Sequence, residues 1–343
     1  GSDFLFFTHS GVGNNSQINT TLLNPHWELT KTISSTADDR NVTSQSIAVG
    51  KTADHTDSAF IIGLPKHKHS GGVNGSGVIY QYKYDGTGLS NYALYPKKAD
   101  GSSDITTLNT NFGSVLSVYG NYLAVAEGKL TETYGGSIYI FKKESTQSYW
   151  PSSTGDHGNY KKITGDDNAV GKRLARQYAY TSERSYYSYG GISIYDVWLA
   201  VNGRHYDGSS YFGRTYIYKR DTNDDWTLHQ TILTSDIQTS PSHQGYDVRI
   251  FGDKLVILLV TGIVFYKLEN DNWSFIQYIT ETVNYTRIVG MKQDMVVTCS
   301  SVNNIYSTEA QGRIYKYSDP SWNTTPLLNI LPDYSLSSHT GSR

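Results

Sequence analysis

Apolar and polar residues alternate with a period of two along most of the chain, while the spacing typical of amphipathic helices is scarce. Successive side chains of a strand point to opposite faces, so this alternation predicts β-strands. The clearest run gives four strands, at residues 112–120, 121–127, 136–143 and 160–164. The chain is therefore predicted to be all-β, and its strands come in groups of four.

The four-strand group recurs along the chain. The other complete copies are predicted at 45–49, 59–62, 77–83 and 92–95; at 192–196, 198–201, 214–220 and 226–233; at 246–251, 254–260, 262–268 and 273–280; and at 285–289, 295–299, 312–317 and 326–331. A split copy would combine 4–7, 18–23 and 27–33 with 334–338 from the other end of the chain. Repeated four-stranded units are typical of β-propellers. We therefore predict one domain, residues 1–343, forming a single six-bladed β-propeller whose last blade is closed by both termini.

Tryptophan recurs at one place in these copies. Trp27, Trp226 and Trp273 each open a fourth strand, and Trp322 lies just ahead of one. Repetition at equivalent positions is what packing between blades requires, so we favour packing over ligand stacking for these side chains.

One phrase of the sequence is more specific than the strand pattern. The run Phe-Gly-Ser-Val-Leu-Ser-Val-Tyr-Gly-Asn-Tyr-Leu-Ala-Val at 112–125, with Gly-Ser-Ile-Tyr-Ile-Phe at 136–141, resembles the FG-GAP repeat family, and Gly-Asp-Lys-Leu-Val at 252–256 is similar. That family includes the integrin α-subunit propeller, bacterial surface proteins and some fungal lectins. Its propellers often have seven blades, which is the alternative to our count of six. Many members carry an Asp-x-Asp-x-Asp-Gly calcium loop, and no such run occurs in this sequence.

Loop lengths separate the two faces of the predicted propeller. Connections from second to third strand and from one blade to the next are long, and in a propeller they emerge on the same face. Loops on a rigid scaffold often carry function. The longest crossover, 165–191, is rich in Tyr, Ser, Gly and Arg, a composition typical of binding loops. The candidate ligand-binding residues on this face are Arg176, Tyr178, Tyr180, Arg184, Tyr186, Tyr187, Tyr189, His205 and Tyr206. The alternative is a Tyr-rich flap folded onto its own propeller.

Acidic residues follow the fourth strand in every copy. The candidate metal ligands among them are Asp100, Asp104, Asp166, Asp167 and Asp236, because a ring of carboxylates could hold a hard cation such as Ca²⁺. The alternative, which we prefer, is that each Asp caps a turn by accepting hydrogen bonds from backbone two residues on. No cofactor is required by the sequence, and Ca²⁺ is the one it suggests.

Composition excludes several classes of function. The 29 Lys and Arg nearly balance 31 Asp and Glu, which argues against a generically basic nucleic-acid binder. No apolar run is long enough for a transmembrane helix, and a single cysteine, Cys299, allows no disulfide within the chain.

Enzyme motifs are absent as well: there is no Gly-x-Ser-x-Gly elbow, His-Glu-x-x-His helix or phosphate-binding glycine loop. The sequence therefore favours a non-catalytic recognition module, a lectin-like, adhesin or receptor-binding protein that contacts a glycan or cell-surface protein through the long-loop face. Its expected location is extracellular or on a cell or virion surface. The alternative is a propeller enzyme, a hydrolase or oxidoreductase, with a metal or carboxylates at the ring axis.

Overall fold

The computed structural model describes the strands and the turns next to them. The described residues are 3–9, 27–34, 47–51, 58–65, 75–84, 89–98, 100–105, 111–127, 136–144, 150, 160–165, 171–174, 177–179, 186–188, 191–206, 211–233, 247–259, 262–280, 286–300, 312–324 and 326–330. They contain strands and turns and no helix, which confirms the all-β prediction. Within this part of the chain no helix is long and apolar enough to cross a membrane.

Most strands belong to five antiparallel sheets, named sheets 1 to 5 in chain order. Sheet 1 contains β3 (Ile47–Lys51), β4 (Ser58–Leu64), β5 (Val78–Tyr84) and β6 (Leu89–Leu94). Sheet 2 contains β7 (Phe112–Tyr119), β8 (Tyr122–Glu127), β9 (Ser137–Lys142) and β10 (Tyr160–Thr164). Sheet 3 contains β14 (Ile192–Tyr195), β15 (Trp198–Tyr206), β16 (Tyr211–Arg220) and β17 (Trp226–Leu233), with β11 (Gly171–Leu174) added beside β15.

The last two sheets follow the same order. Sheet 4 contains β18 (Asp247–Phe251), β19 (Lys254–Leu259), β20 (Gly262–Glu269) and β21 (Asn272–Thr280). Sheet 5 contains β22 (Thr286–Lys292), β23 (Met295–Ser300) and β24 (Gly312–Ser318), and β25 (Ser321–Trp322) and β26 (Leu328–Ile330) both pair with β24. Two short pairs stand apart from these sheets: β1 (Asp3–His9) with β2 (Trp27–Ser34), and β12 (Gln177–Ala179) with β13 (Tyr186–Ser188).

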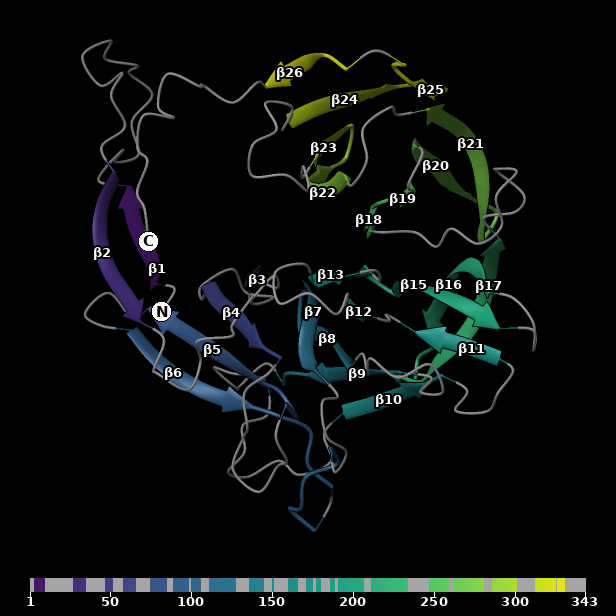
Figure 1. Ribbon diagram of the computed structural model, residues 1–343. Coiled ribbons are helices and arrows are strands. Elements are labelled where there is room, and N and C mark those ends of the chain that lie inside the picture. Colours follow the sequence, from purple (N-terminus) through teal and green to yellow (C-terminus); the bar gives the residue numbers. More distant parts are fainter. Residues whose placement is uncertain are drawn as a thin grey trace.

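The five sheets succeed one another in chain order around the molecule, and the β1–β2 pair stands between sheet 5 and sheet 1 (Figure 1). The first strands of neighbouring sheets are in contact: β3 with β7, β7 with β14, β14 with β18 and β18 with β22. This arrangement of four-stranded sheets is consistent with a propeller. The described residues do not form a closed ring, so neither the count of six blades nor closure by the termini is established here.

The β1–β2 pair departs from the predicted last blade. Residues 4–7 were expected to be a second strand and 27–33 a fourth, with 18–23 between them. Instead β1 and β2 pair directly, Phe4 opposite Ile33 and Asp3 opposite Ser34. The alternation of apolar residues identifies a strand but not its partner, and these two strands are of similar length, 7 and 8 residues. Residues 18–23 and 334–338 lie outside the described residues.

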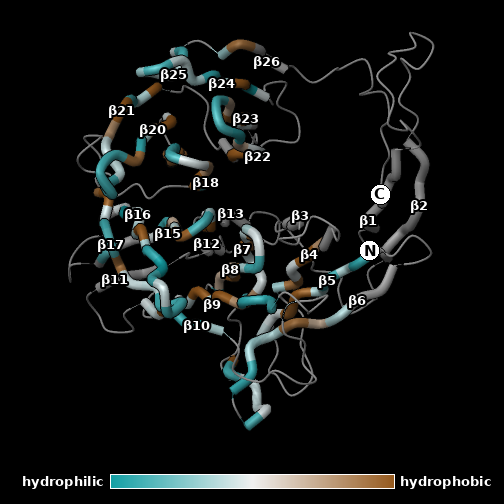
Figure 2. The backbone as a smooth tube through the Cα atoms, turned by 180° about the vertical axis from the view of Figure 1, so that it is seen from behind, coloured by the Kyte–Doolittle hydropathy of each residue, from teal (hydrophilic) through white to brown (hydrophobic). Residues whose placement is uncertain are grey.

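Four apolar clusters fill the spaces between neighbouring sheets. On β8, Leu123 and Val125 face sheet 1, while Ala124 and Ala126 belong to the cluster shared with sheet 3. Further clusters join sheet 3 to sheet 4 and sheet 4 to sheet 5. In Figure 2 the brown, hydrophobic stretches accordingly lie within strands. Alternation along one strand thus sends its side chains into two different cores.

The recurring tryptophans pack between sheets. The ring centroids of Trp198 and Trp273 are 5.7 Å apart, and Trp322 stacks on Phe265 of the preceding sheet at 4.5 Å. The Trp226 ring meets Tyr122 of sheet 2 edge-on, with 6.2 Å between centroids. The packing interpretation is confirmed for Trp226, Trp273 and Trp322. The side chain of Trp27 is not among those that the structure describes.

Glutamine side chains bind the backbone of Trp273, Trp322 and a further tryptophan, Trp150, from the sheet before each of them. Gln230 donates to the Trp273 carbonyl and accepts from the Trp273 N–H, both at 2.9 Å. Gln81 makes the same pair of bonds to Trp150, at 3.2 and 2.9 Å. The Gln277 carbonyl accepts from the Trp322 N–H at 2.8 Å. These bonds satisfy backbone groups that a buried fourth-strand edge would otherwise leave unpaired.

Near the axis, the first strands are so close that a side chain added to Gly191 has no room. Gly191 directly precedes β14, and a Cβ there would lie 2.5 Å from the Val248 nitrogen, whereas a Cβ at Gly290, on the first strand β22, meets nothing within 4 Å. We expect Gly191→Ala to destabilise the fold by about 1–3 kcal/mol, because β14 and β18 must move apart.

Gly290→Ala is the matched control, and its free energy of unfolding should change by less than about 1 kcal/mol. Urea unfolding of both variants measures the difference. Equal stabilities would show that β14 and β18 do not approach this closely.

Candidate functional site

The predicted binding flap contains strands as well as loop. In β12 and β13, Tyr178 pairs with Tyr187 and Ala179 with Tyr186, so the crossover turns back on itself as a hairpin. The pairing of β11 with β15 places His205 opposite Lys172 and Tyr206 opposite Gly171. No strand was predicted in the crossover because its strand segments are short and polar. The remaining candidates, Arg176, Tyr180, Arg184 and Tyr189, lie outside the described residues.

The predicted acidic ring is described at two of its positions. Asp100 accepts hydrogen bonds from the Ser102 N–H at 2.8 Å and the Ser102 hydroxyl at 2.6 Å, which is the turn-capping arrangement. These bonds hold the pKa of the Asp100 carboxyl below its ordinary value. Asp166, Asp167 and Asp236 lie outside the described residues. Within the described part of the chain no three His, Cys, Asp or Glu residues gather as a metal site would require, and calcium binding stays a prediction.

Asp104, in the crossover from sheet 1 to sheet 2, has a different environment. Its Oδ2 accepts from the Lys162 ammonium at 2.9 Å and from the Tyr139 hydroxyl at 3.1 Å. The Tyr139 hydroxyl also lies 3.1 Å from Oε2 of Glu127. Glu127 ends β8 and is 2% exposed. Two carboxyl groups and a lysine thus surround one phenol, an arrangement we call the carboxylate cluster.

The strands of sheet 2 explain how the cluster forms. Tyr139 lies on β9, directly opposite Val125 of β8 and Lys162 of β10. Glu127 is two residues further along β8, so the side chains of Glu127 and Val125 share a face with Tyr139. The crossover then brings Asp104 against this face. The Lys162 ammonium lies 4.9 Å from the centre of the Tyr139 ring, a cation–π contact that fixes the lysine there.

Neighbouring groups shift the pKa values of Asp104 and of the adjacent Tyr160. Burial opposes ionisation of Asp104, but the hydrogen bond and positive charge of Lys162, with the Tyr139 and Tyr160 hydroxyls, prevail and lower the pKa of this carboxyl. Burial and the neighbouring Asp104 raise the pKa of Tyr160. At neutral pH, Asp104 is therefore a carboxylate and Tyr160 a neutral phenol.

The shared hydroxyl of Tyr139 limits how far apart the two carboxyl groups of the cluster can lie. Since both carboxyl oxygens lie 3.1 Å from one hydroxyl, they are no more than twice that distance apart. The Asp104 side chain is 16% exposed and that of Lys162 is 32% exposed, so the cluster reaches solvent on the Asp104 side.

A second ion pair lies among the first strands. Arg249 donates to Oδ1 of Asp247 at 2.8 Å, and Oδ2 of Asp247 accepts from the Ile288 N–H at 3.1 Å. The guanidinium also approaches the Ile192 carbonyl at 3.4 Å. The pair therefore joins β14, β18 and β22. Asp247 is 4% exposed, and both its oxygens are bound, which fits a structural role for this axial carboxylate.

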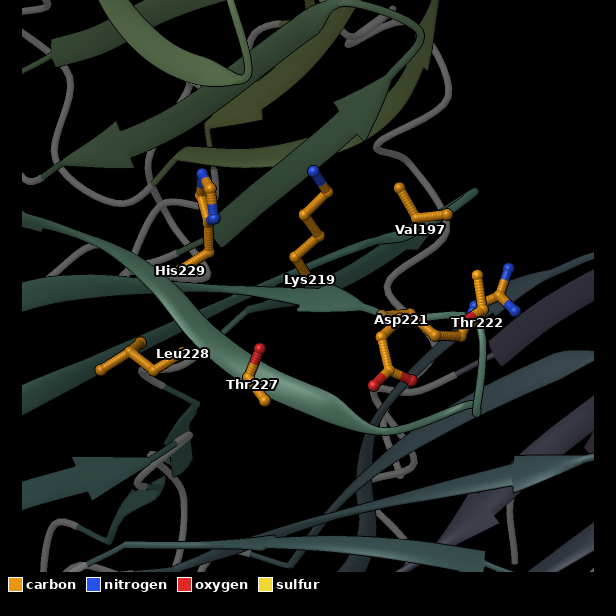
Figure 3. A pocket seen from close by; sticks show the side chains of 8 residues that line it. Val197, Lys219, Asp221, Thr222, Thr227, Leu228 and His229 are labelled. Atoms are coloured by element: carbon orange, nitrogen blue, oxygen red, sulfur yellow. The ribbon is translucent and has the colours of Figure 1, made fainter.

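A pocket lies beside the turn between β16 and β17 (Figure 3). Its volume is about 590 Å³, and it is lined by Val197, Lys219, Arg220, Asp221, Thr222, Thr227, Leu228 and His229. None of the predicted ligand-binding residues lines it. No candidate was predicted here because function was expected at the long connections, whereas the turn between β16 and β17 is short.

No protein-family model matches the chain, and no curated protein matches it. Among solved structures, the chain is similar to a Bacteroides uniformis protein provisionally named a 6-phosphogluconolactonase, with 7% identity and a TM-score of 0.47. The match covers 83% of this chain and 71% of that one.

The matched protein carries an enzyme's name, and this finding stands against the prediction of a non-catalytic recognition module. That prediction is corrected: the alternative, a propeller enzyme, agrees better with it. A similarity of this size assigns neither a reaction nor a substrate to the chain, and those rest on the residues of the site.

The carboxylate cluster makes a prediction about protonation. We expect Lys162→Met to raise the pKa of Asp104 because it removes a hydrogen bond and a positive charge, and Tyr139→Phe to raise it less because it removes only a hydroxyl. Carboxyl ¹³C NMR titration measures both changes. Asp100, which is held by Ser102, is the internal control and should titrate unchanged.

The contact between Lys162 and Asp104 also predicts how the stability of the protein depends on pH. A carboxyl whose pKa is lower in the folded state stabilises the fold above its unfolded pKa, and this contribution is lost as the pH falls through the folded pKa. Lys162→Met should therefore destabilise the protein at pH 7 and matter less at acid pH. If neither Lys162→Met nor Tyr139→Phe changes the titration of Asp104, the contacts assigned to Asp104 in the carboxylate cluster are wrong.

Proposed function

We propose that the protein is a hydrolase in which Asp104 and Glu127 of the carboxylate cluster act as a catalytic pair. The supporting observation is that both carboxyl groups lie 3.1 Å from the single hydroxyl of Tyr139. Hydrolysis of glycosidic bonds commonly uses two carboxyl groups, and retaining enzymes place them about 5–5.5 Å apart. The upper limit set by Tyr139 is compatible with that spacing, so we propose an O-glycoside as the substrate.

The two carboxyl groups have different roles in this proposal. Asp104 is ionised and partly exposed, so its carboxylate attacks the anomeric carbon as the glycosidic C–O bond breaks. Glu127 is the proton donor to the leaving oxygen in this proposal. It is 2% exposed, so the substrate must enter past Asp104 for its leaving oxygen to reach Glu127. A water molecule then attacks the glycosyl ester, returns a proton to Glu127 and releases Asp104. Tyr139 holds the two groups in register, and Lys162 keeps Asp104 charged.

The proposal extends to the fold and the setting of the protein. We propose that the five sheets belong to a six-bladed ring of the FG-GAP type, whose last blade includes the β1–β2 pair, and that the protein acts outside the cell or at a cell or virion surface. The first-strand contacts from β3 to β22 support the ring. The FG-GAP resemblance of residues 112–125 supports the setting.

A panel of nitrophenyl glycosides tests the activity directly. We expect Glu127→Gln and Asp104→Asn each to lower kcat by about 100-fold or more, the usual contribution of an acid–base group. In Asp104→Ala, added azide should restore turnover and give a glycosyl azide, because a small anion can take the place of the missing nucleophile.

Asp225→Asn is the matched control. Asp225 is also a carboxylate paired with a lysine of β10, Lys161 at 2.6 Å, but it lies outside the cluster and is exposed. This variant should keep full activity. If the wild-type protein hydrolyses nothing on the panel, or if Glu127→Gln and Asp104→Asn retain wild-type rates while folded, the proposed function is wrong.

A further inference from the structure

The pocket beside the β16–β17 turn, here called the turn pocket, is separate from the carboxylate cluster and has no role in the proposed hydrolysis. Its volume, about 590 Å³, is that of a small-molecule site, which is typically about 300–1,000 Å³. The side chains of Lys219 and His229 extend to the same side of the turn pocket, toward the neighbouring strands (Figure 3). Val197 and Leu228 contribute apolar surface.

The polar groups of the turn pocket are mostly hydrogen-bond donors or hydroxyls. Lys219, Arg220 and His229 contribute nitrogen, and Thr222 and Thr227 contribute hydroxyls. The lining contains one carboxylate, Asp221, whose Oδ1 already accepts from the N–H groups of Asn223 and Asp225 at 2.8 Å. Such a lining favours a ligand with acceptor oxygens.

One anion already reaches this place from the next sheet. Asp271, in the turn between β20 and β21, accepts from the Lys219 ammonium through both carboxylate oxygens at 2.6 Å. Its carbonyl oxygen lies 2.7 Å from Nε2 of His229. The lysine lowers the pKa of Asp271, so this side chain is ionised at neutral pH.

Comparison with the equivalent lysine–aspartate pair one sheet earlier shows that Asp271 is unusually exposed. Lys142 of β9 bonds Asp224 of the next sheet at 2.8 Å, but that carboxylate also accepts from Tyr122 at 2.6 Å and Arg220 at 2.8 Å and is 29% exposed. Asp271 is 53% exposed. An exposed ion pair contributes little to stability, so a competing anion can displace Asp271 at small cost.

We propose that the turn pocket binds a small organic oxyanion, a phosphate monoester or carboxylate with an apolar body, and that Asp271 occupies the place of the anionic group when no ligand is bound. The ligand's oxygens bond to Lys219, His229 and the threonine hydroxyls, and its apolar body packs on Val197 and Leu228. Asp271 thereby sets the affinity, because each ligand must displace it from Lys219.

Calorimetric titration with phenyl phosphate, and with benzoate for the carboxylate form, tests this site. Lys219→Gln should weaken binding about tenfold or more. Asp271→Asn should strengthen it several-fold, because the ammonium no longer has a competing carboxylate. Lys142→Gln, at the equivalent position one sheet earlier, is the matched control and should bind as the wild type does.

Opposite effects of the Lys219 and Asp271 variants are the signature of a masked anion site, because a purely structural role of the pair would weaken binding in both. Binding of phenyl phosphate alone, or of benzoate alone, would identify the anionic group. The proposal fails if neither probe saturates the wild type or Asp271→Asn, or if Lys142→Gln loses as much affinity as Lys219→Gln. Thermal unfolding of each variant shows that it is folded, and none of these outcomes depends on hydrolysis by the carboxylate cluster.

Discussion

Sheets 2, 3 and 4 are each apolar on both faces, so none of the three can be stable without a neighbour on either side. On β9, Ile138 and Ile140 are buried against sheet 3, while Tyr139 and Phe141 are buried against sheet 1. A four-stranded sheet with two such faces would expose a large apolar surface if it stood alone. This requirement explains why the sheets succeed one another. It also brings side chains of adjacent sheets together at each boundary, as Lys219 and Asp271 show.

Hydrophobic burial draws sheets together but does not fix the angle between them, and polar contacts at repeated positions supply that. The Ser117 hydroxyl accepts from the Ile194 N–H, and the Ser193 hydroxyl from the Ile250 N–H, each at 2.9 Å, so neighbouring first strands are bonded near the axis. Between β18 and β22 the bond is made by Asp247, whose Oδ2 accepts from the Ile288 N–H. The glutamine–tryptophan bonds act further from the axis. Hydrogen bonds are directional. The serine and Asp247 bonds near the axis and the glutamine–tryptophan bonds further out therefore together fix the angle between adjacent sheets.

The sequence predicted the strands well because each carries a two-residue alternation, and the copies reinforce one another. Pairing was harder: nothing in Phe4–Phe7 or Trp27–Ile33 specifies that they lie side by side, since backbone hydrogen bonds are the same for any partner. The polar segments of β11, β12 and β13 gave no alternation to detect. Of the candidate site, Asp104 was recognised as one of several acidic residues. Glu127 was read only as the end of a strand, because its meeting with Tyr139 depends on a crossover whose path no local pattern encodes.

Two successive sheets of the molecule use the same ion-pair arrangement to different ends. A lysine at or next to the end of a third strand reaches an aspartate in the next sheet's turn, as in Lys142–Asp224 and Lys219–Asp271. Where Tyr122 and Arg220 add further bonds, as around Asp224, the pair is a rigid joint. Where the aspartate stays exposed, as at Asp271, the same geometry leaves a cation that a ligand can capture. Repetition thus provides the scaffold, and function can arise where one copy lacks the supporting contacts that its neighbour has.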